Sequence, residues 1–270
     1  MAYLKEYWTG KEKRAEWAKN HTEQMENEYS EKIKESIRDT VYYLPGFECT
    51  KTVLQENATK IIVDDIDSVS AIMKYRKATK DGRMAVLNFS SYKNPGGMFL
   101  NGSKAQEECL CHESFLYNVL SQKQDFYDWN KKHKNKALYL DRGLYSPNIL
   151  FIRKNNDYLA TEKMKFCDVI TCAAPNKSAA QKYQNISDEE NTKVLRSRIK
   201  FVLDIAKDNY VETLILGAYG CGVFGQDARE VSSIFKEYLS TTHICFDRVI
   251  FAIPKGKDGN YQAFEEVFGH

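Results

Sequence analysis

Six short apolar runs, several of them rich in β-branched residues, constrain the fold of this chain more than any other feature of its sequence. They follow Pro45-Gly46, alternate with stretches of helical pattern, and span residues 60–63, 84–89, 149–152, 168–171, 213–216 and 249–253. Continuous apolar strands that alternate with helices are typical of a largely parallel sheet covered on both faces. The sequence therefore predicts an α/β fold with a mixed central sheet.

Helix signals lie between these runs. Asp67 is placed to cap a helix whose apolar positions include Val69 and Ile72. Further helices are predicted over residues 108–120, 187–207 and 228–239. Folds of this kind bind ligands at the carboxyl ends of the strands, so the loops at those ends are the candidate sites.

The N-terminal part of the chain has a different pattern. Between residues 11 and 43 the apolar positions recur mostly every four residues, at Trp17, Met25, Tyr29, Ile33, Ile37 and Val41. This spacing predicts an amphipathic helix. We therefore expect a helical N-terminal extension over residues 1–45 and one domain over residues 46–270.

The composition excludes several classes of protein. With 43% hydrophobic and 28% charged residues, the chain is an ordinary globular sequence rather than a disordered one. The 39 Lys+Arg nearly balance 37 Asp+Glu, so no direct nucleic-acid partner is expected from bulk charge. No apolar stretch approaches the ~20 residues of a membrane helix, and the N-terminus lacks a signal-peptide core. We expect a cytoplasmic protein without a membrane partner; its oligomeric state stays open.

The seven cysteines include no CxxC pair, which favours free thiols. Cys109, Cys111 and His112 are close in sequence, but they do not share one face of a helix and no second ligand pair follows. We therefore predict no metal and no cofactor. Cys221 is a candidate nucleophile in a glycine-rich loop, although the sequence places no histidine beside it.

Paired glycines mark the loop that leaves the run at 84–89, in the motif Asn94-Pro95-Gly96-Gly97. Paired glycines let the backbone approach a ligand and present N–H groups to an anion. A tight turn with no ligand would need the same residues.

Two adjacent carboxylates, Glu107 and Glu108, follow Gln106 at the start of the next predicted helix. They are either functional groups or favourable charges against the helix dipole. Neighbouring residues on a helix point about 100° apart, so both need not reach one substrate atom.

A second glycine-rich loop leads from the run at 213–216 towards the helix at 228–239. Its candidate ligand-binding residues are Gly217, Ala218, Tyr219, Gly220, Cys221, Gly222, Val223 and Phe224. Backbone N–H groups and a helix N-terminus can together hold a phosphate. The loop is neither a Walker A motif nor a GxGxxG fingerprint, and a generic glycine loop is the alternative.

Taken together, these motifs resemble the bacterial-type poly(ADP-ribose) glycohydrolases. The glycine motif followed by Gln106-Glu107-Glu108 is similar to the signature of that family, and residues 169–176, 217–224, 251–253 and 260–264 are similar to further family blocks in the same order. The resemblance implies a macrodomain-like three-layer α/β/α sandwich. It also implies ADP-ribose or poly(ADP-ribose) as ligand, ADP-ribosylated proteins as partners, and hydrolysis of the O-glycosidic ribose–ribose bond to release ADP-ribose.

The resemblance further implies roles for individual residues. Glu108 would be the catalytic residue, acting first as general acid and then as general base, and Glu107 would hold a ribose hydroxyl. Gln106 would order the loop, and residues 217–224 would wrap the diphosphate. The remaining candidates are Asn88, Asn94, Gly96 and Gly97 around the first loop, with Asn260 and Phe264 on the adenosine side.

One departure from the family signature is Met98, which stands where a third consecutive glycine is usual. A side chain there could crowd the ligand. Two alternatives to the hydrolase therefore stay open: a non-catalytic macrodomain that binds ADP-ribose, and a hydrolase of another ADP-ribosylated substrate. Residues 121–143, rich in lysine and aromatic residues, are either a solvated helical face or a contact for a polyanionic polymer.

Overall fold

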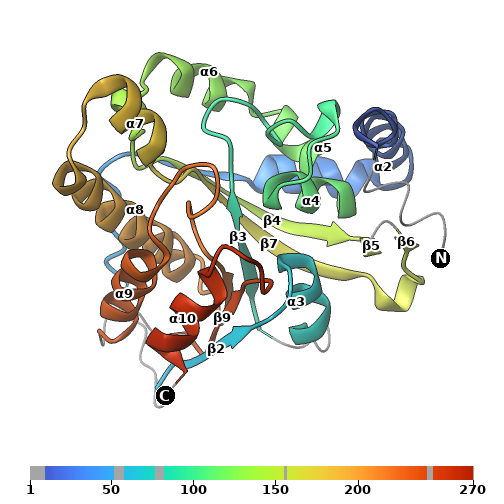
Figure 1. The fold of residues 1–270 in the computed structure, drawn as a ribbon. Coiled ribbons are helices and arrows are strands. Elements are labelled where there is room, and N and C mark those ends of the chain that lie inside the picture. The colour runs from blue at the N-terminus through green and yellow to red at the C-terminus, as the bar shows by residue number, and fades with distance from the viewer. Residues whose placement is uncertain (1–9, 52–57, 77–81, 155–156, 242–245, 270) are drawn as a thin grey trace.

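The computed structural model describes residues 10–51, 58–76, 82–154, 157–241 and 246–269 (Figure 1). A seven-stranded sheet forms the centre, in the order β1-β4-β7-β3-β8-β9-β2, and β5 pairs with β6 in a separate small sheet. The strands are β1 Val41–Tyr43, β2 Lys60–Asp64, β3 Met84–Phe89, β4 Gly143–Phe151, β5 Arg153–Lys154, β6 Asp157–Tyr158, β7 Lys165–Cys172, β8 Thr213–Leu216 and β9 Arg248–Ala252.

Most strand pairs of the central sheet are parallel. β3 pairs in parallel with β7 and β8, and β9 pairs in parallel with β8 and β2. Only β4 with β7 and β1 with β4 are antiparallel. The predicted α/β class with a mixed, largely parallel sheet is therefore confirmed.

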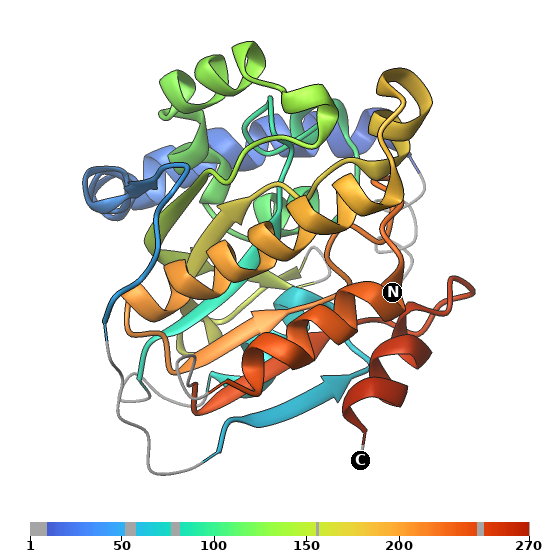
Figure 2. The same cartoon turned by 90° about the vertical axis from the view of Figure 1, so that its left-hand side faces the viewer.

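Helices cover both faces of the sheet. They are α2 Lys11–Asp39, α3 Ser68–Tyr75, α4 Gln106–Glu113, α5 Leu116–Ser121, α6 Gln124–Lys132, α7 Lys177–Gln184, α8 Asp188–Asp208, α9 Ala228–Leu239 and α10 Asn260–Phe268, with short 3-10 turns η1 Phe99–Asn101, η2 Asn135–Ala137 and η3 Thr161–Lys163. Figure 2 shows α8 and α9 running across one face. Helices α2 to α5 lie on the other side (Figure 1).

Each face has its own apolar core. One core joins Ile199 and Phe235 of α8 and α9 to Leu214 of β8. The other joins Met25 of α2 and Val119 of α5 to residues such as Val169 of β7 and Ile250 of β9. This arrangement is the expected three-layer sandwich, and α2 is packed into it.

The N-terminal helix is shorter than predicted. It ends at Asp39, and Val41, expected on its apolar side, instead begins β1 and pairs with Tyr145 of β4. The backbone of Thr40 is already extended, with φ −67° and ψ 120°. β-branched and aromatic residues at 41–43 suit a strand better than a helix, which explains the switch.

The helix predicted over residues 108–120 is divided into α4 and α5. Ser114 between them has φ −150° and ψ −179°, and its hydroxyl accepts a hydrogen bond from Leu116 N at 3.1 Å. Serine competes for backbone hydrogen bonds in this way and so interrupts helices. α6 lies within residues 121–143, where a solvated helical face was one of the two expectations, whereas α7 and α10 were not predicted.

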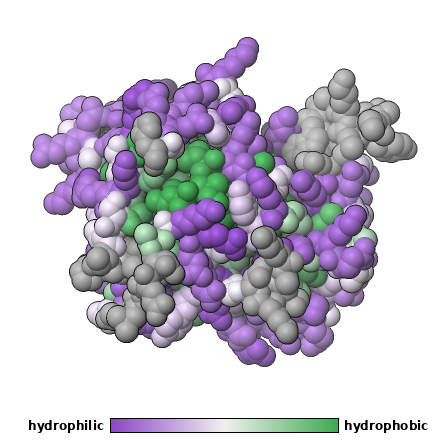
Figure 3. Space-filling model, turned by 90° about the horizontal axis from the view of Figure 1, so that it is seen from below, coloured by the Kyte–Doolittle hydropathy of each residue, from purple (hydrophilic) through white to green (hydrophobic). Residues whose placement is uncertain are grey.

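The surface of the molecule is mainly hydrophilic when seen from below, with one area where hydrophobic residues gather (Figure 3). Among the described residues, no helix combines the length and the apolar character needed to cross a membrane.

Candidate active site

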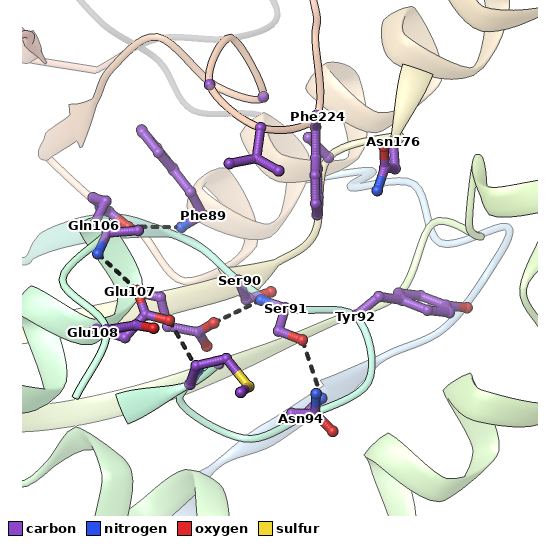
Figure 4. A pocket seen from close by; sticks show the side chains of 18 of the residues that line it. Phe89, Ser90, Ser91, Tyr92, Asn94, Gln106, Glu107, Glu108, Asn176 and Phe224 are labelled. Atoms are coloured by element: carbon purple, nitrogen blue, oxygen red, sulfur yellow. Dashed lines mark hydrogen bonds between the residues drawn. The ribbon is translucent and has the colours of Figure 1, made fainter. Parts of the chain in front are cut away.

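A pocket of about 630 Å³ opens at the carboxyl ends of β3, β7 and β8 (Figure 4). This is the edge of the sheet at which α/β folds bind ligands. The predicted site residues that line it are Asn94, Gly97, Gln106, Glu107, Glu108, Ala218, Gly220, Gly222, Val223 and Phe224. The two motifs that the sequence singled out thus form parts of one cavity.

Glu107 is the more deeply held of the two carboxyls, with 3% of its surface exposed. Ser91 N donates to its Oε2 at 2.6 Å, and Asn88 Nδ2 donates to its Oε1 at 3.2 Å. Burial raises the pKa of Glu107 to about 8, the charge of Glu108 adds to the rise, and the hydrogen bonds oppose it. Glu107 therefore holds a proton at neutral pH.

Glu108 is fixed by the backbone on both sides. Met98 N donates to Oε1 and Ala105 N donates to Oε2, each at 2.9 Å. Ala105 is the residue that precedes α4, so the second bond is the return half of a capping box. The first bond ties the glycine loop to the same carboxyl, and the loop and the helix start therefore hold Glu108 in one orientation.

Gly97 is the point at which both carboxyls converge. A Cβ added to it would lie 2.5 Å from Glu108 Oε1 and 2.9 Å from Glu107 Oε2, and its φ of +61° favours glycine. The two side chains therefore approach one point, even though neighbouring helical residues diverge. The loop backbone fits between them only without a side chain at this position.

Met98 occupies the third glycine position without backbone strain, since its φ is −110°. Its N–H still reaches Glu108, and 46% of its surface is exposed at the pocket. A side chain at this position therefore leaves the carboxyl in place and adds a thioether to the wall.

Gln106 connects α4 to β3. Its Oε1 accepts a bond from Phe89 N at 2.9 Å, and its Nε2 donates to Leu87 O at 2.8 Å. These bonds fix the start of α4 against the end of the strand.

Asn88 does not line the pocket. It is fully buried, and its amide donates to Glu107 and to Thr171 Oγ1, at 3.2 and 3.3 Å. The prediction that it contacts the ligand is therefore corrected: Asn88 lies behind Glu107 and positions its carboxyl.

The second glycine loop lines the pocket and contains backbone donors without a partner among the described residues. Among the described residues, no acceptor pairs with the backbone N–H of Gly220, Gly222, Val223 or Phe224. Val223 is 89% exposed. The loop thus has the unpaired donors that an anion cradle needs.

Four predicted site residues lie behind the lining rather than in it. A Cβ added to Gly96 would meet the Tyr117 ring at 2.8 Å, and one added to Gly217 would meet Ala252 O at 2.9 Å, so both glycines are closely packed. Tyr219 is buried and donates to Cys172 O at 2.9 Å. These three residues support the two loops by packing outside the pocket lining.

Cys221 is the fourth. Its Sγ contacts Tyr219 O at 3.7 Å, and burial raises the pKa of its thiol to about 12. No histidine lines the pocket among the described residues. The thiol is therefore protonated and has no base, which argues against the nucleophile alternative.

Asn260 and Phe264 lie on α10, away from the pocket lining. Phe264 is fully buried and its ring lies 5.0 Å from that of Phe251. The Asn260 amide donates to Asp258 at 2.9 Å. The apolar side of α10 turns Phe264 into the core and away from a ligand, whereas the contact expected of Asn260 stays a prediction.

An aromatic wall faces the carboxylates. Tyr92 and Tyr139 stack with ring centroids 4.2 Å apart, and Phe224 lies 6.1 Å from Tyr139. Figure 4 shows Tyr92, Phe224 and Asn176 on the side away from Glu107 and Glu108. Tyr139 has a left-handed φ of 63°, which is unusual for a residue with a side chain.

Arg198 of α8 holds this wall from behind. It is fully buried, its Nε pairs with Asp141 Oδ1 at 2.6 Å, and its Nη1 donates to Ala173 O. Its Nη2 also reaches Leu138 O at 3.5 Å. The Arg198 guanidinium therefore links the segment that follows β7 to the segment that contains Tyr139.

Several lining residues were not predicted, namely Phe89, Ser90, Ser91, Tyr92, Lys93, Met98, Ser103, Ala105, Tyr139, Ala174 and Asn176. Asn176 follows Pro175 after a predicted strand and caps α7, which is a signal the sequence contains. Tyr139 has no such local signal. Within the described ranges, no group of three or more His, Cys, Asp or Glu residues is arranged to hold a metal ion.

The comparisons with known proteins agree with this geometry. The family model described as microbial-type PARG, catalytic domain, matches residues 13–154. Poly(ADP-ribose) glycohydrolase (PARG) from Thermomonospora curvata is 28% identical, with a TM-score of 0.82 over 94% of this chain and 99% of that chain. The same enzyme bound to the inhibitor ADP-HPD is 29% identical, with a TM-score of 0.80 over 94% and 98%.

PARG from Deinococcus radiodurans in complex with ADP-ribose is 29% identical, with a TM-score of 0.76 over 87% of this chain and 96% of that chain. No curated protein matches the chain. The family match covers more than half of the sequence and includes the glycine loop and both carboxylates. The chain therefore belongs to the microbial-type PARG catalytic-domain family.

Proposed function

We propose that this protein is a poly(ADP-ribose) glycohydrolase that releases ADP-ribose from the polymer, including polymer attached to proteins. The observation that carries the proposal is the convergence of two buried carboxyls on one point of a pocket that also holds an anion cradle. Glycosidic hydrolysis needs a proton donor at the leaving oxygen and a base for water. The similar structures from two bacteria are of enzymes with this activity.

We assign the acid and base role to Glu108. It gives a proton to the 2′ oxygen of the departing ribose as the bond from that oxygen to the anomeric carbon breaks. Water then attacks the oxocarbenium-like carbon, and Glu108 takes the proton released by the water. The two backbone bonds at 2.9 Å hold its carboxyl still through both steps.

Glu107 is the positioning group for the ribose in this proposal. Its raised pKa keeps a proton on the two neighbouring carboxyls, so the pair carries one negative charge rather than two while Glu107 holds a ribose hydroxyl. Two interacting carboxyls titrate as a pair. The shared proton lies on Glu108 when Glu108 protonates the leaving oxygen, and the proton taken from water restores it to the pair. The diphosphate would lie on the unpaired N–H groups of residues 220–224.

The test compares the wild type with Glu108→Gln, Glu107→Gln and the surface control Glu189→Gln. Release of ADP-ribose from automodified substrate is measured together with calorimetric binding of ADP-ribose. Glu108→Gln is expected to lower turnover by at least ~10²-fold with binding retained, as for loss of an acid–base group. Glu107→Gln is expected to weaken binding as well.

If Glu107→Gln instead lowers turnover with binding retained, and Glu108→Gln weakens binding, then Glu107 is the acid–base group and Glu108 positions the ribose. Binding of ADP-ribose by the wild type without any release would contradict the enzyme and leave a non-catalytic ADP-ribose-binding protein. Loss of both in Glu189→Gln would show that the assay reports folding rather than the site.

A further inference from the structure

A run of exposed lysines lies next to the aromatic wall. Residues 131–136 are all exposed and include Lys131, Lys132, Lys134 and Lys136. They begin in the last turn of α6 and continue into the 3-10 turn η2. The proposed reaction uses none of them.

Backbone hydrogen bonds place this run directly outside the pocket. Tyr92 donates from its hydroxyl to His133 O at 2.9 Å, and Tyr139 N donates to Lys134 O at 3.1 Å. Asn176 N also donates to Ala137 O at 3.1 Å. Three lining residues are thus bonded to the segment, so its surface continues the wall outward.

The turn that carries these lysines is unusual. Asn135, Lys136 and Ala137 have left-handed φ values of 43°, 51° and 66°. No residue of η2 is fully buried, although Ala137 packs against a small apolar cluster that includes Ala180 and Ile186. Strained backbone of this kind concentrates at functional sites.

Positive charge on this segment is largely uncompensated. Lys131 pairs with Asp128 at 2.9 Å. Among the described residues, no carboxylate lies within ion-pair distance of Lys132, Lys134 or Lys136, or of Lys93 inside the pocket. Lys93 follows Tyr92, whose carbonyl accepts a bond from Asn130 of α6 at 2.9 Å. This bond joins the segment that carries Lys93 to α6, and we call Lys93, Lys132, Lys134 and Lys136 together the basic strip.

We propose that Lys93, Lys132, Lys134 and Lys136 bind the diphosphates of the poly(ADP-ribose) units that lie beyond the unit held in the pocket. The inference rests on the proposed function. Each unit of the polymer carries a diphosphate, and lysines that neutralise a polyanion release its counterions, as they do on single-stranded nucleic acids. The strip would then retain the polymer as its end unit is cleaved.

The test uses a triple variant, Lys132→Gln, Lys134→Gln and Lys136→Gln. Its matched control, Lys19→Gln, Lys60→Gln and Lys163→Gln, removes the same charge from exposed lysines of α2, β2 and η3. Binding of long poly(ADP-ribose) is measured at several salt concentrations in the Glu108→Gln background, and ADP-ribose monomer serves as the short ligand.

The triple variant is expected to weaken polymer binding by about tenfold and to reduce the slope of log K against log salt by about 2, at roughly 0.7 per phosphate contact. The loss should be greater for the polymer than for the monomer. Equal losses in the triple variant and the control would overturn the proposal. Equal competition by a single-stranded oligonucleotide of the same phosphate count would also overturn it, because the strip would then bind any polyanion.

Failure of the proposed function would look different. In that case the wild type would release no ADP-ribose, whereas the polymer affinities would still report on the lysines.

Discussion

The carboxylate end of the pocket is built from one stretch of chain, residues 88–108, whereas the aromatic end joins four segments that are distant in sequence. At the first end, short-range bonds from Ser91, Met98 and Ala105 hold the two glutamates. At the second end, Arg198 bonds to Ala173 and Asp141, which belong to two different segments of the wall. Changes at the first end should therefore act on the rate, and changes at the second should act on folding.

Arg198→Met is the most severe test of this comparison. It removes the cation that pairs with Asp141 and the donor to Ala173 O, and loss of one partner of a buried ion pair costs about 3–5 kcal/mol. Denaturant unfolding should show this loss in the free energy of unfolding. The control Arg196→Met, on the same helix, breaks only an exposed pair with Glu237 and should change stability by about 0.5 kcal/mol or less. Similar losses in both variants would mean that Arg198 does not hold the wall.

Gly97→Ala tests the carboxylate end. The new Cβ would displace both carboxyls, and a misplacement of about 1 Å can lower kcat/KM by roughly 10²-fold. Gly46→Ala is the matched control, because Gly46 has a similar φ of +88° but nothing within 4 Å of an added Cβ. If steady-state hydrolysis falls equally in both, backbone strain and not the glutamates explains the effect.

The proton on Glu107 predicts how stability depends on pH. Between its ordinary pKa of 4.5 and the folded value of about 8, the folded protein binds one more proton than the unfolded chain. Stability should therefore fall as pH rises through this window, by up to about 1.4 kcal/mol per pH unit. Unfolding at pH 5 and pH 8 should show a weaker decline in Glu107→Gln than in the wild type or in Glu12→Gln. If the free energy of unfolding declined equally with pH in Glu107→Gln and in the wild type, the extra proton of the folded protein would not be on Glu107.

Met98→Gly should have the smallest effect. The backbone N–H that holds Glu108 is retained, and an added glycine costs about 0.5–1 kcal/mol of stability through the unfolded chain. ADP-ribose binding, measured by calorimetry, should change little, and Met98→Leu controls for side-chain volume. A large gain in affinity on removing the side chain would show that Met98 obstructs the pocket.

The same contrast explains how much could be predicted from the sequence. The strands at 84–89 and 213–216 and the helix at 228–239 have their predicted bounds, since breakers or polar residues flank each apolar pattern. The glutamates were predicted at a helix start because their motif is local. Their convergence was not predicted, because it depends on the glycine loop folding back over α4.

The aromatic end of the pocket could not be predicted from the sequence, because it depends on an unusual backbone conformation and on contacts between distant segments. The left-handed backbone of Tyr139 is uncommon for a bulky residue, and no local pattern signals it. Arg198 gave no signal either, because its carbonyl partners, Leu138 and Ala173, are far from it in the chain. Phe264 was misplaced because the apolar pattern of α10 was not recognised.

The position of β2 has a consequence for how the chain folds during synthesis. Among the described residues, this strand pairs with β9 alone, with Lys60 opposite Arg248. At a synthesis rate of about 5–20 residues per second, its partner would emerge on the order of 10–40 s later. Pairings between such distant segments also form slowly. The edge strand is therefore expected to be the last part of the sheet to form, and to depend on protection from other nascent chains until it does.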